Sequence, residues 1–331
     1  MIKIIIALLI IFTISCNTVK KENADDNKEL IPDKVLKKCI KKNLKYDLTK
    51  ENLLKVKKFT CTGKDGLIKN FKGIKLLKNV KYFNLNSQNL INLDLIADLS
   101  NINHLNLSYN HITDISKIKK LVKITKLNLK YNEIKDVSVL KKLKNIKILN
   151  LEYNIISDIK VLADFEKLIE VDLEYNEIEE IPDFSKLKNL NWLDLSTNNI
   201  KNLKNLNTLV NIKKLYLAEN KLTKLPDLEN LITLTNLNVQ FNKIKNLDFI
   251  KNNLNLTNLD LEGNGLIDIS ILESLVNLKW LDLDSNSVKD ISPLLNLNKL
   301  KRMYITDNCV KDFKNMNKKY VRGMGSQRDC K

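Results

Sequence analysis

The stretch NHITDISKIKKLVKITKLNL, residues 110–129, is most of one period of a pattern that fills the greater part of the chain. It opens on an asparagine, and an amide side chain returns at the same place every 22 residues without a slip. These positions are Asn110, Asn132, Asn154, Asn176, Asn198, Asn220, Asn242, Asn264, Asn286 and Asn308, with Gln88 one period earlier. A fixed period of this length indicates a solenoid of stacked turns.

Three apolar columns keep the same period through eleven turns. Around Asn132, for example, they are Leu127 and Leu129, which precede it, and Ile134, which follows it. Alternation around L-x-L is the period of a strand, so these segments predict a parallel sheet with neighbouring strands about 4.8 Å apart. The predicted fold class is therefore an α/β solenoid of eleven 22-residue turns, bent into a horseshoe or shallow arc with the sheet on its concave face.

The amide column has a structural explanation. Where the chain leaves each strand, backbone N–H and C=O groups face inward without a ladder partner. An asparagine side chain donates and accepts at once, so it can bridge adjacent turns. Replacing Asn264 by leucine would leave buried backbone groups unpaired, at about 1–3 kcal/mol for each group.

Residues 110–129 and the block NSVKDISPLLNLNKLKRMYI, residues 286–305, resemble the 22-residue leucine-rich repeats of internalin-type bacterial proteins. The resemblance covers roughly residues 31–310. It implies the leucine-rich repeat fold and a use as an adhesin or surface ligand, with a protein partner that is host-derived in such cases. The chain departs from the pattern at Gln88, Pro182 and Pro226, and the two prolines are expected to alter the return arc and to leave the strand unchanged.

Residues 1–15 predict a signal peptide, because Lys3 is followed by an uninterrupted apolar run that is too short to span a bilayer. Cys16 ends this run and resembles the cysteine of a bacterial lipobox, although Thr13 stands where leucine is usual. The resemblance implies that Cys16 is lipidated, which would anchor an exported protein to the cell envelope, at the outer membrane or cell surface. An ordinary cleaved signal that contains a cysteine is the alternative. Residues 16–30 are polar and predict a lipidated tether.

The remaining boundaries follow from the period. Residues 31–66 predict a helical N-terminal cap, with helices beginning near Asp33 and Thr49. Residues 67–310 are the repeats, beginning with a degenerate first turn. Residues 311–331 predict a C-terminal cap that folds back over the last turn.

Four cysteines besides Cys16 fall as one pair near each end of the solenoid: Cys39 with Cys61, and Cys309 with Cys330. Three pairings are formally available. Because the ends of a solenoid lie tens of ångströms apart, only the local pairing is within reach of disulfides. A metal site is not expected, since neither histidine lies near a cysteine and C-x-x-C spacing is absent.

The residues immediately before, between and after the two inward leucines point outward on the concave face. Both tryptophans of the chain fall in the first of these columns. The predicted partner-binding residues are Trp192, Tyr216, Trp280, Tyr304, Asp172, Glu174, Asp194, Asp260 and Asp282. Exposed aromatic rings flanked by carboxylates are typical of protein interfaces. The alternative is that strands favour aromatic residues and the rings only cover the sheet.

Charge separates the concave face from the rest of the chain. The three outward columns hold four positive side chains against nine negative ones, whereas the whole chain has a formal net charge of +17. An acidic presenting face and an exported location argue against nucleic acid as a partner. The basic remainder could face anionic lipid or polysaccharide, and solvated charge is the favoured interpretation.

No catalytic pattern is present in the sequence. It has two histidines, no G-x-S-x-G and no glycine loop for phosphate, so an enzyme is not expected and no cofactor is implied. Tyr109, Tyr131, Tyr153 and Tyr175 precede successive asparagines and should stack as a ladder at the rim of the sheet. Two functions remain. One is a monomeric surface lipoprotein that binds a protein partner through the concave face, and the other is a periplasm-facing envelope scaffold for an endogenous partner.

Overall fold

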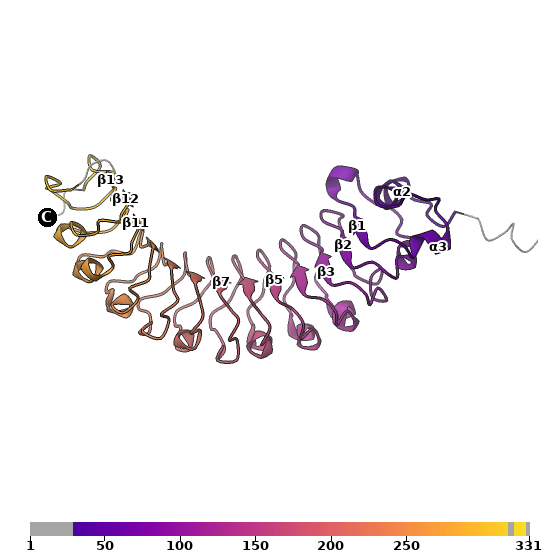
Figure 1. Ribbon diagram of the computed structural model, residues 1–331, viewed down its shortest axis with the longest axis horizontal. Helices are drawn as coiled ribbons and strands as arrows, with labels where there is room; N and C mark the ends of the chain where they lie inside the picture. The colour runs from indigo at the N-terminus through magenta and orange to yellow at the C-terminus, as the bar shows by residue number, and fades with distance from the viewer. Residues whose placement is uncertain (1–28, 317–320, 329–331) are drawn as a thin grey trace, which may run out of the picture.

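The computed structural model describes residues 29–316 and 321–328, which form one arc (Figure 1). The predicted signal peptide, Cys16, most of the tether, and Cys330 lie outside the described residues. Within the described part, no helix combines the length and the apolar character that a bilayer crossing requires.

One parallel sheet runs the length of the arc on its concave side, as predicted, and its strands follow one another in chain order. From β2 to β12 each strand pairs with the next at a shift of one repeat, for example Leu127 with Leu149. The strands are β1 (Lys58–Thr60), β2 (Tyr82–Asn84), β3 (His104–Asn106), β4 (Lys126–Asn128), β5 (Ile148–Asn150), β6 (Glu170–Asp172), β7 (Trp192–Asp194), β8 (Lys214–Tyr216), β9 (Asn236–Asn238), β10 (Asn258–Asp260), β11 (Trp280–Asp282), β12 (Arg302–Tyr304) and β13 (Val321–Arg322).

The sheet is longer than the eleven predicted turns by one strand at each end. β1 lies within the predicted N-terminal cap, where the buried ring of Phe59 packs 5.1 Å from that of Phe83. β13 lies within the predicted C-terminal cap and pairs in parallel with β12. The C-terminal segment returns to lie against the last predicted turn, where buried Val321 pairs with Met303 and continues the stack.

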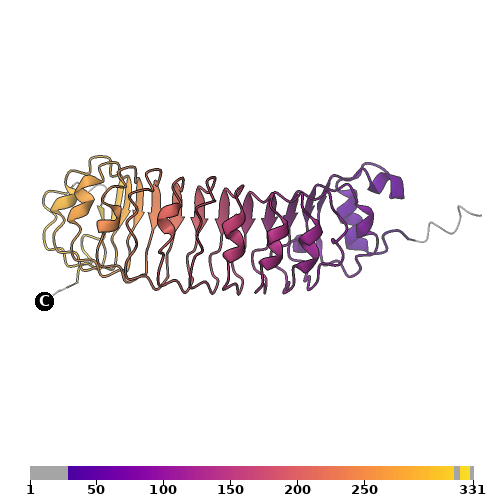
Figure 2. The same cartoon turned by 90° about the horizontal axis from the view of Figure 1, so that it is seen from below.

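The return arcs form the convex side and carry short 3-10 helices (Figures 1 and 2). They are η1 (Gly63–Asp65), η2 (Ile74–Leu76), η3 (Ser116–Lys120), η4 (Ser138–Lys142), η5 (Lys160–Asp164), η6 (Leu206–Thr208), η7 (Asp248–Ile250), η8 (Ser270–Ser274) and η9 (Ser292–Leu294). In the described chain, the arcs that contain Pro182 and Pro226 have no such helix. The strands on both sides of these arcs keep their register, as predicted.

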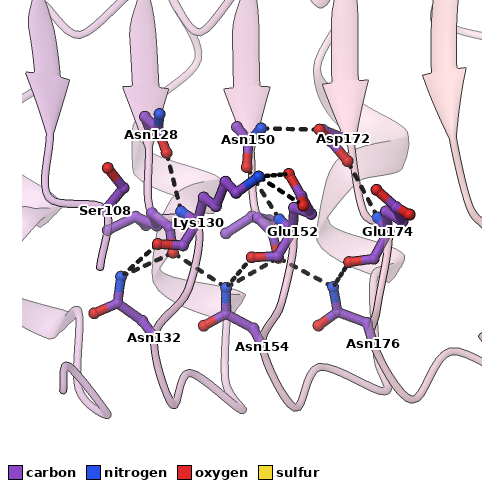
Figure 3. Close-up of polar contacts among 12 residues, drawn as sticks. Ser108, Asn128, Lys130, Asn132, Asn150, Glu152, Asn154, Asp172, Glu174 and Asn176 are labelled. Atoms are coloured by element: carbon purple, nitrogen blue, oxygen red, sulfur yellow. Dashed lines mark hydrogen bonds and ion pairs between the residues drawn. The ribbon is translucent and has the colours of Figure 1, made fainter. Parts of the chain in front are cut away.

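The amide column forms the predicted hydrogen-bonded ladder (Figure 3). Asn132 Oδ1 accepts from the N–H of Ile112 in the preceding turn at 3.1 Å. Its Nδ2 donates to Leu107 O at 3.1 Å and to Leu129 O at 2.9 Å, so one side chain joins two turns. A glutamine closes the ladder at each end: Gln88 Oε1 accepts from Ile68 N, and Gln327 Nε2 donates to Ile305 O.

Two helices cap the N-terminal end of the stack. Helix α2 (Lys34–Lys41) starts at Asp33, whose carboxylate accepts from Leu36 N and from Lys69 N, tying the helix to the first turn. Helix α3 (Lys50–Leu53) starts at Thr49, as predicted. Cys39 and Cys61 form the predicted disulfide, with a Cα–Cα distance of 5.3 Å. Cys309 is buried and disulfide-bonded, whereas its predicted partner lies outside the described residues.

Candidate partner-binding face

Every strand from β2 to β12 presents its middle residue to the core and its two outer residues to the concave surface. Trp192 and Trp280 open β7 and β11, while Tyr216 and Tyr304 close β8 and β12. All four rings are partly exposed. Five carboxylates accompany them, also partly exposed: Asp172, Glu174, Asp194, Asp260 and Asp282. The predicted contact residues thus share one open surface.

The aromatic rings form two separate pairs. The ring centroids of Trp192 and Tyr216 lie 5.7 Å apart at an interplanar angle of 52°. Those of Trp280 and Tyr304 lie 6.1 Å apart at 57°. Because β9 and β10 lie between β8 and β11, the two pairs do not touch, and the face has two aromatic positions along its length.

The residue at the end of nine strands has a local structural role that was not predicted from the sequence. Its side-chain Oδ1 accepts from the backbone N–H two residues later, which stabilises the turn out of the strand. The acceptors are Asn84, Asn106, Asn128, Asn150, Asp172, Asp194, Asn238, Asp260 and Asp282, at 2.8–3.2 Å. Asparagine and aspartate perform this task alike. Tyr216 and Tyr304 stand in the same column without an Oδ1.

The carboxylates gather in two clusters. Oxygens of Glu152, Asp172 and Glu174 lie within 4.8 Å of one another, and so do those of Asp260, Glu262 and Asp282. The first cluster is partly neutralised, because Lys130 Nζ lies 2.6 Å from Glu152 Oε2 (Figure 3). Acidic groups of this kind occur without a metal, and we assign no metal to either cluster.

Burial and mutual repulsion disfavour ionisation of these acids. Desolvation, followed by neighbouring carboxylates, raises the pKa of Glu174 to about 7. Desolvation likewise raises the pKa of Asp172 to about 6, although the hydrogen bond from Glu174 N opposes it. In the second cluster the same causes raise the pKa of Asp260 to about 6 and that of Asp282 to about 7. The face therefore carries negative charge that its surroundings stabilise poorly.

A hollow of about 220 Å³ lies between the two aromatic pairs. Tyr216 and Trp280 line it from opposite sides. The rest of its lining comes from Leu237, Asp260 and the side chains of Asn236, Asn238 and Asn258. These asparagines fall in the predicted outward columns but were not among the predicted site residues, because asparagines at that spacing give no sign of a hollow.

The predicted tyrosine ladder is present at the rim. Consecutive ring centroids from Tyr109 to Tyr175 lie 4.7, 4.0 and 4.0 Å apart, with interplanar angles of 11–14°. All four residues have φ near +55°, in the left-handed region that favours glycine. Ring stacking along the arc offsets part of this conformational cost.

A family model described as leucine-rich repeats in two copies matches residues 122–164. An internalin, InlF, from Listeria monocytogenes is similar in structure, with a TM-score of 0.77 and 24% identity over 88% of this chain and 94% of its own. This chain has the leucine-rich repeat fold.

Other leucine-rich repeat structures are also similar. A leucine-rich repeat protein of Leptospira interrogans gives a TM-score of 0.62 at 26% identity, covering 73% of this chain and 70% of its own. The plant peptide hormone receptor RGFR1, solved in complex with RGF2, gives 0.63 at 23% identity, covering 71% and 41%. No curated protein matches the chain. These similarities establish the fold. The kind of partner has to be inferred from the residues of the site.

Proposed function

We propose that this leucine-rich repeat chain is a non-catalytic protein-binding protein of the bacterial cell envelope, which meets its partner with the concave face. One observation carries the proposal: both tryptophans of the chain stand partly exposed on that face among carboxylates. Partly exposed aromatic rings on an open surface contribute strongly to protein interfaces once a partner covers them. The plant receptor with a similar fold was solved with RGF2 bound, which supports this use of the fold.

The anchor is the second element of the proposal. Lipidation of Cys16 would attach the exported chain, as a monomer, to the outer membrane or cell surface, with the tether spacing the arc from the lipid. In cells grown with a labelled fatty acid, the wild-type chain should take up the label and fractionate with membranes. Cys16→Ser should lose both properties. Label retained in the serine variant would reject Cys16 as the lipidation site.

The concave face is tested by capturing a partner on the immobilised full chain. Trp192→Ala combined with Trp280→Ala should weaken capture at least tenfold, at a melting temperature close to that of the wild type. The matched control is Ile232→Ala with Ile267→Ala, which removes two exposed apolar side chains of the return arcs. Capture that survives the tryptophan substitutions, or fails equally in the control, would reject the concave face as the binding surface.

The orientation of the protein separates two partner classes. Protease treatment of intact cells should remove the repeats if the protein is displayed to a host or neighbouring cell. Protection until the outer membrane is opened would instead favour a periplasm-facing scaffold that binds an endogenous protein. Both outcomes use the same concave face.

A further inference from the structure

Six outward positions on or two residues beyond β6, β7 and β8 recur with the same chemistry at β10, β11 and β12. The first acidic-aromatic group consists of Asp172, Glu174, Trp192, Asp194, Lys214 and Tyr216. The second consists of Asp260, Glu262, Trp280, Asp282, Arg302 and Tyr304. Each member of the second group follows its counterpart by four repeats, and five of the six are the same amino acid.

The recurrence does not extend to the rest of these turns. The arc between β6 and β7 contains Pro182 and, in the described chain, no 3-10 helix, whereas the arc between β10 and β11 contains η8. Exposed side chains of the two arcs also differ in kind, as with Glu179 against Ile267. Among the outward positions of these turns the six named ones recur, while Glu170, Ser196 and Ala218 are replaced four repeats later by Asn258, Asp284 and Thr306. The recurrence is therefore limited to the six positions of the acidic-aromatic groups and does not extend to the return arc between β6 and β7.

The fold does not require the negative charge of these groups. Asp194 and Asp282 accept from the backbone N–H two residues later at 2.8 and 2.9 Å. Asn106 makes the same hydrogen bond at 3.0 Å without a charge. Aspartate in place of asparagine therefore keeps the turn and adds a charge that burial and neighbouring acids oppose. A charge with no structural task on a partner-facing surface indicates a positively charged ligand.

The two groups also present their rings alike. Tryptophan and tyrosine centroids are 5.7 Å apart in the first group and 6.1 Å in the second, at angles of 52° and 57°. Rings beside carboxylates attract cations through both the ring face and the opposite charge. Because strands are about 4.8 Å apart, four repeats place equivalent points of the two groups about 19 Å apart.

The surface between the two groups suits the backbone of a peptide. The hollow runs from Tyr216 of the first group to Trp280 of the second, over the amides of Asn236, Asn238 and Asn258. The Oδ1 atoms of these asparagines already accept from Thr235 Oγ1, Gln240 N and Thr257 Oγ1. Their Nδ2 groups can therefore donate to peptide C=O groups without adding charge. An extended segment could therefore cross from one group to the other.

We propose that the two acidic-aromatic groups are equivalent subsites for one extended basic peptide segment, which places a lysine or arginine side chain about 19 Å from a second one. This inference rests on the proposed function, since it names the chemistry of the partner on the same face. The raised pKa values of Asp172, Glu174, Asp260 and Asp282 are consistent with it, because a bound cation relieves the repulsion among these acids.

The test uses proline-spaced peptides as rulers, since each residue of a polyproline II helix spans about 3.1 Å. In the long diarginine peptide, two terminal arginines flank a run of about five prolines and lie about 19 Å apart. The short diarginine peptide has a run of about two prolines, which spans only about half that distance. The single-arginine peptide keeps the long run but ends in alanine, and the diglutamate peptide keeps the long run and reverses both charges.

The chain itself supplies the reporters. It has two tryptophans, one in each acidic-aromatic group. Their two indole N–H resonances, assigned with Trp192→Phe and Trp280→Phe, therefore report each subsite separately in the full chain.

We expect the long diarginine peptide to shift both indole resonances with one common midpoint, at least tenfold tighter than the short or single-arginine peptide. Asp172→Asn with Asp194→Asn, or Asp260→Asn with Asp282→Asn, should each reduce its affinity to that of the single-arginine peptide. Equal affinity for all spacings, a response at one indole only, or binding of the diglutamate peptide would overturn the inference. If a natural partner is captured through Trp192 and Trp280 while neither indole responds to the long diarginine peptide, the proposed function stands and this inference is wrong.

Discussion

Strands β2 to β5 and the strand pairs β6–β7 and β10–β11 have the same backbone and the same turn hydrogen bond but different charge. At the end of the first set stand Asn84, Asn106, Asn128 and Asn150, and at the end of the second set stand Asp172, Asp194, Asp260 and Asp282. In both sets the side-chain oxygen accepts from the backbone two residues on, at 2.8–3.2 Å.

The two sets of strands share the hydrogen bonds that the fold requires and differ in the charge that they present at the surface. The amide ladder beneath the strands is the same under both regions, because Asn132 and Asn264 each bridge two turns with similar distances. At the strand-end position, carboxylates occur only on β6, β7, β10 and β11, and each of these strands carries a tryptophan or adjoins a strand that does. A solenoid keeps its structural columns uniform and can vary its outward columns turn by turn. The binding surface proposed above lies where those columns depart from asparagine.

The largest expected effect comes from the ladder. Asn132→Leu and Asn264→Leu should each lower the free energy of unfolding by about 3 kcal/mol, because at least two buried backbone groups lose their partners at about 1–3 kcal/mol each. The loss of stability should be similar in the region of β2 to β5, whose strands end in neutral asparagine, and in the acidic region of β6–β7 and β10–β11. Urea denaturation followed by circular dichroism measures it.

The matched control for the ladder is Asn255→Leu. Asn255 also donates to a carbonyl of the preceding turn, Ile232 O at 2.8 Å, but it is exposed, so water can replace it. Its cost should stay below about 1 kcal/mol. If Asn255→Leu lowers the free energy of unfolding as much as Asn264→Leu, the hydrogen bond between turns sets the cost whether or not the unpaired groups are buried.

The second effect is a pH dependence of peptide binding. Between about pH 8 and about pH 5.5, Glu174 and Asp282, with pKa values raised to about 7, and Asp172 and Asp260, at about 6, should take up protons. Arginine keeps its charge throughout. The affinity for the long diarginine peptide should therefore fall at least fivefold, measured from the indole resonances.

Other charged side chains face these four acids and are part of the same titration: Lys130, Glu152 and Asp194 in the first region, and Glu262 and Asp284 in the second. Peptide affinity that is unchanged over this pH range would show that the acids are not at the contact. The diglutamate peptide provides the control, since protonation of the face should not weaken its binding.

Periodicity predicted the sheet, the ladder and the outward columns because each depends only on which residue returns every 22 positions. It missed β1, where the second inward residue is Cys61, used for the disulfide, and β13, where the equivalent place is Gly323. Neither end contains L-x-L. The recurrence at four repeats can be read from the columns, but the ring pairs and the hollow depend on side-chain rotamers that no spacing specifies.

A smaller effect concerns the stability of the acidic region. Replacing Asp172, Asp194, Asp260 and Asp282 together by asparagine should keep the turn hydrogen bonds and remove repulsion. Their pKa values are raised in the folded chain above the unfolded value of about 3.9. The folded wild type therefore holds more protons between about pH 4 and about pH 7, and these acids cost stability as pH rises through that window.

The fourfold asparagine variant should accordingly melt at the wild-type temperature at about pH 4 and above it at about pH 8. Differential scanning calorimetry of both chains at each pH measures the difference in melting temperature. Titration of the groups that both chains share cancels in this difference. A variant less stable than the wild type at the higher pH would show that the carboxylates stabilise the fold, and the distinction between structural amide and added charge would fail.

The smallest effect is the reciprocal change in the neutral region. Asn106→Asp and Asn128→Asp should preserve the hydrogen bonds to Ser108 N and Lys130 N, which now measure 3.0 Å each. Nearby Lys126 and Lys130 offset the new charges, so the free energy of unfolding at neutral pH should change by less than about 0.5 kcal/mol. Asn106→Leu and Asn128→Leu, which remove the acceptor, should cost more, about 1 kcal/mol each. If aspartate lowers the free energy of unfolding as much as leucine does, the fold requires a neutral side chain at the ends of these strands. The two regions would then differ in what the fold requires as well as in charge.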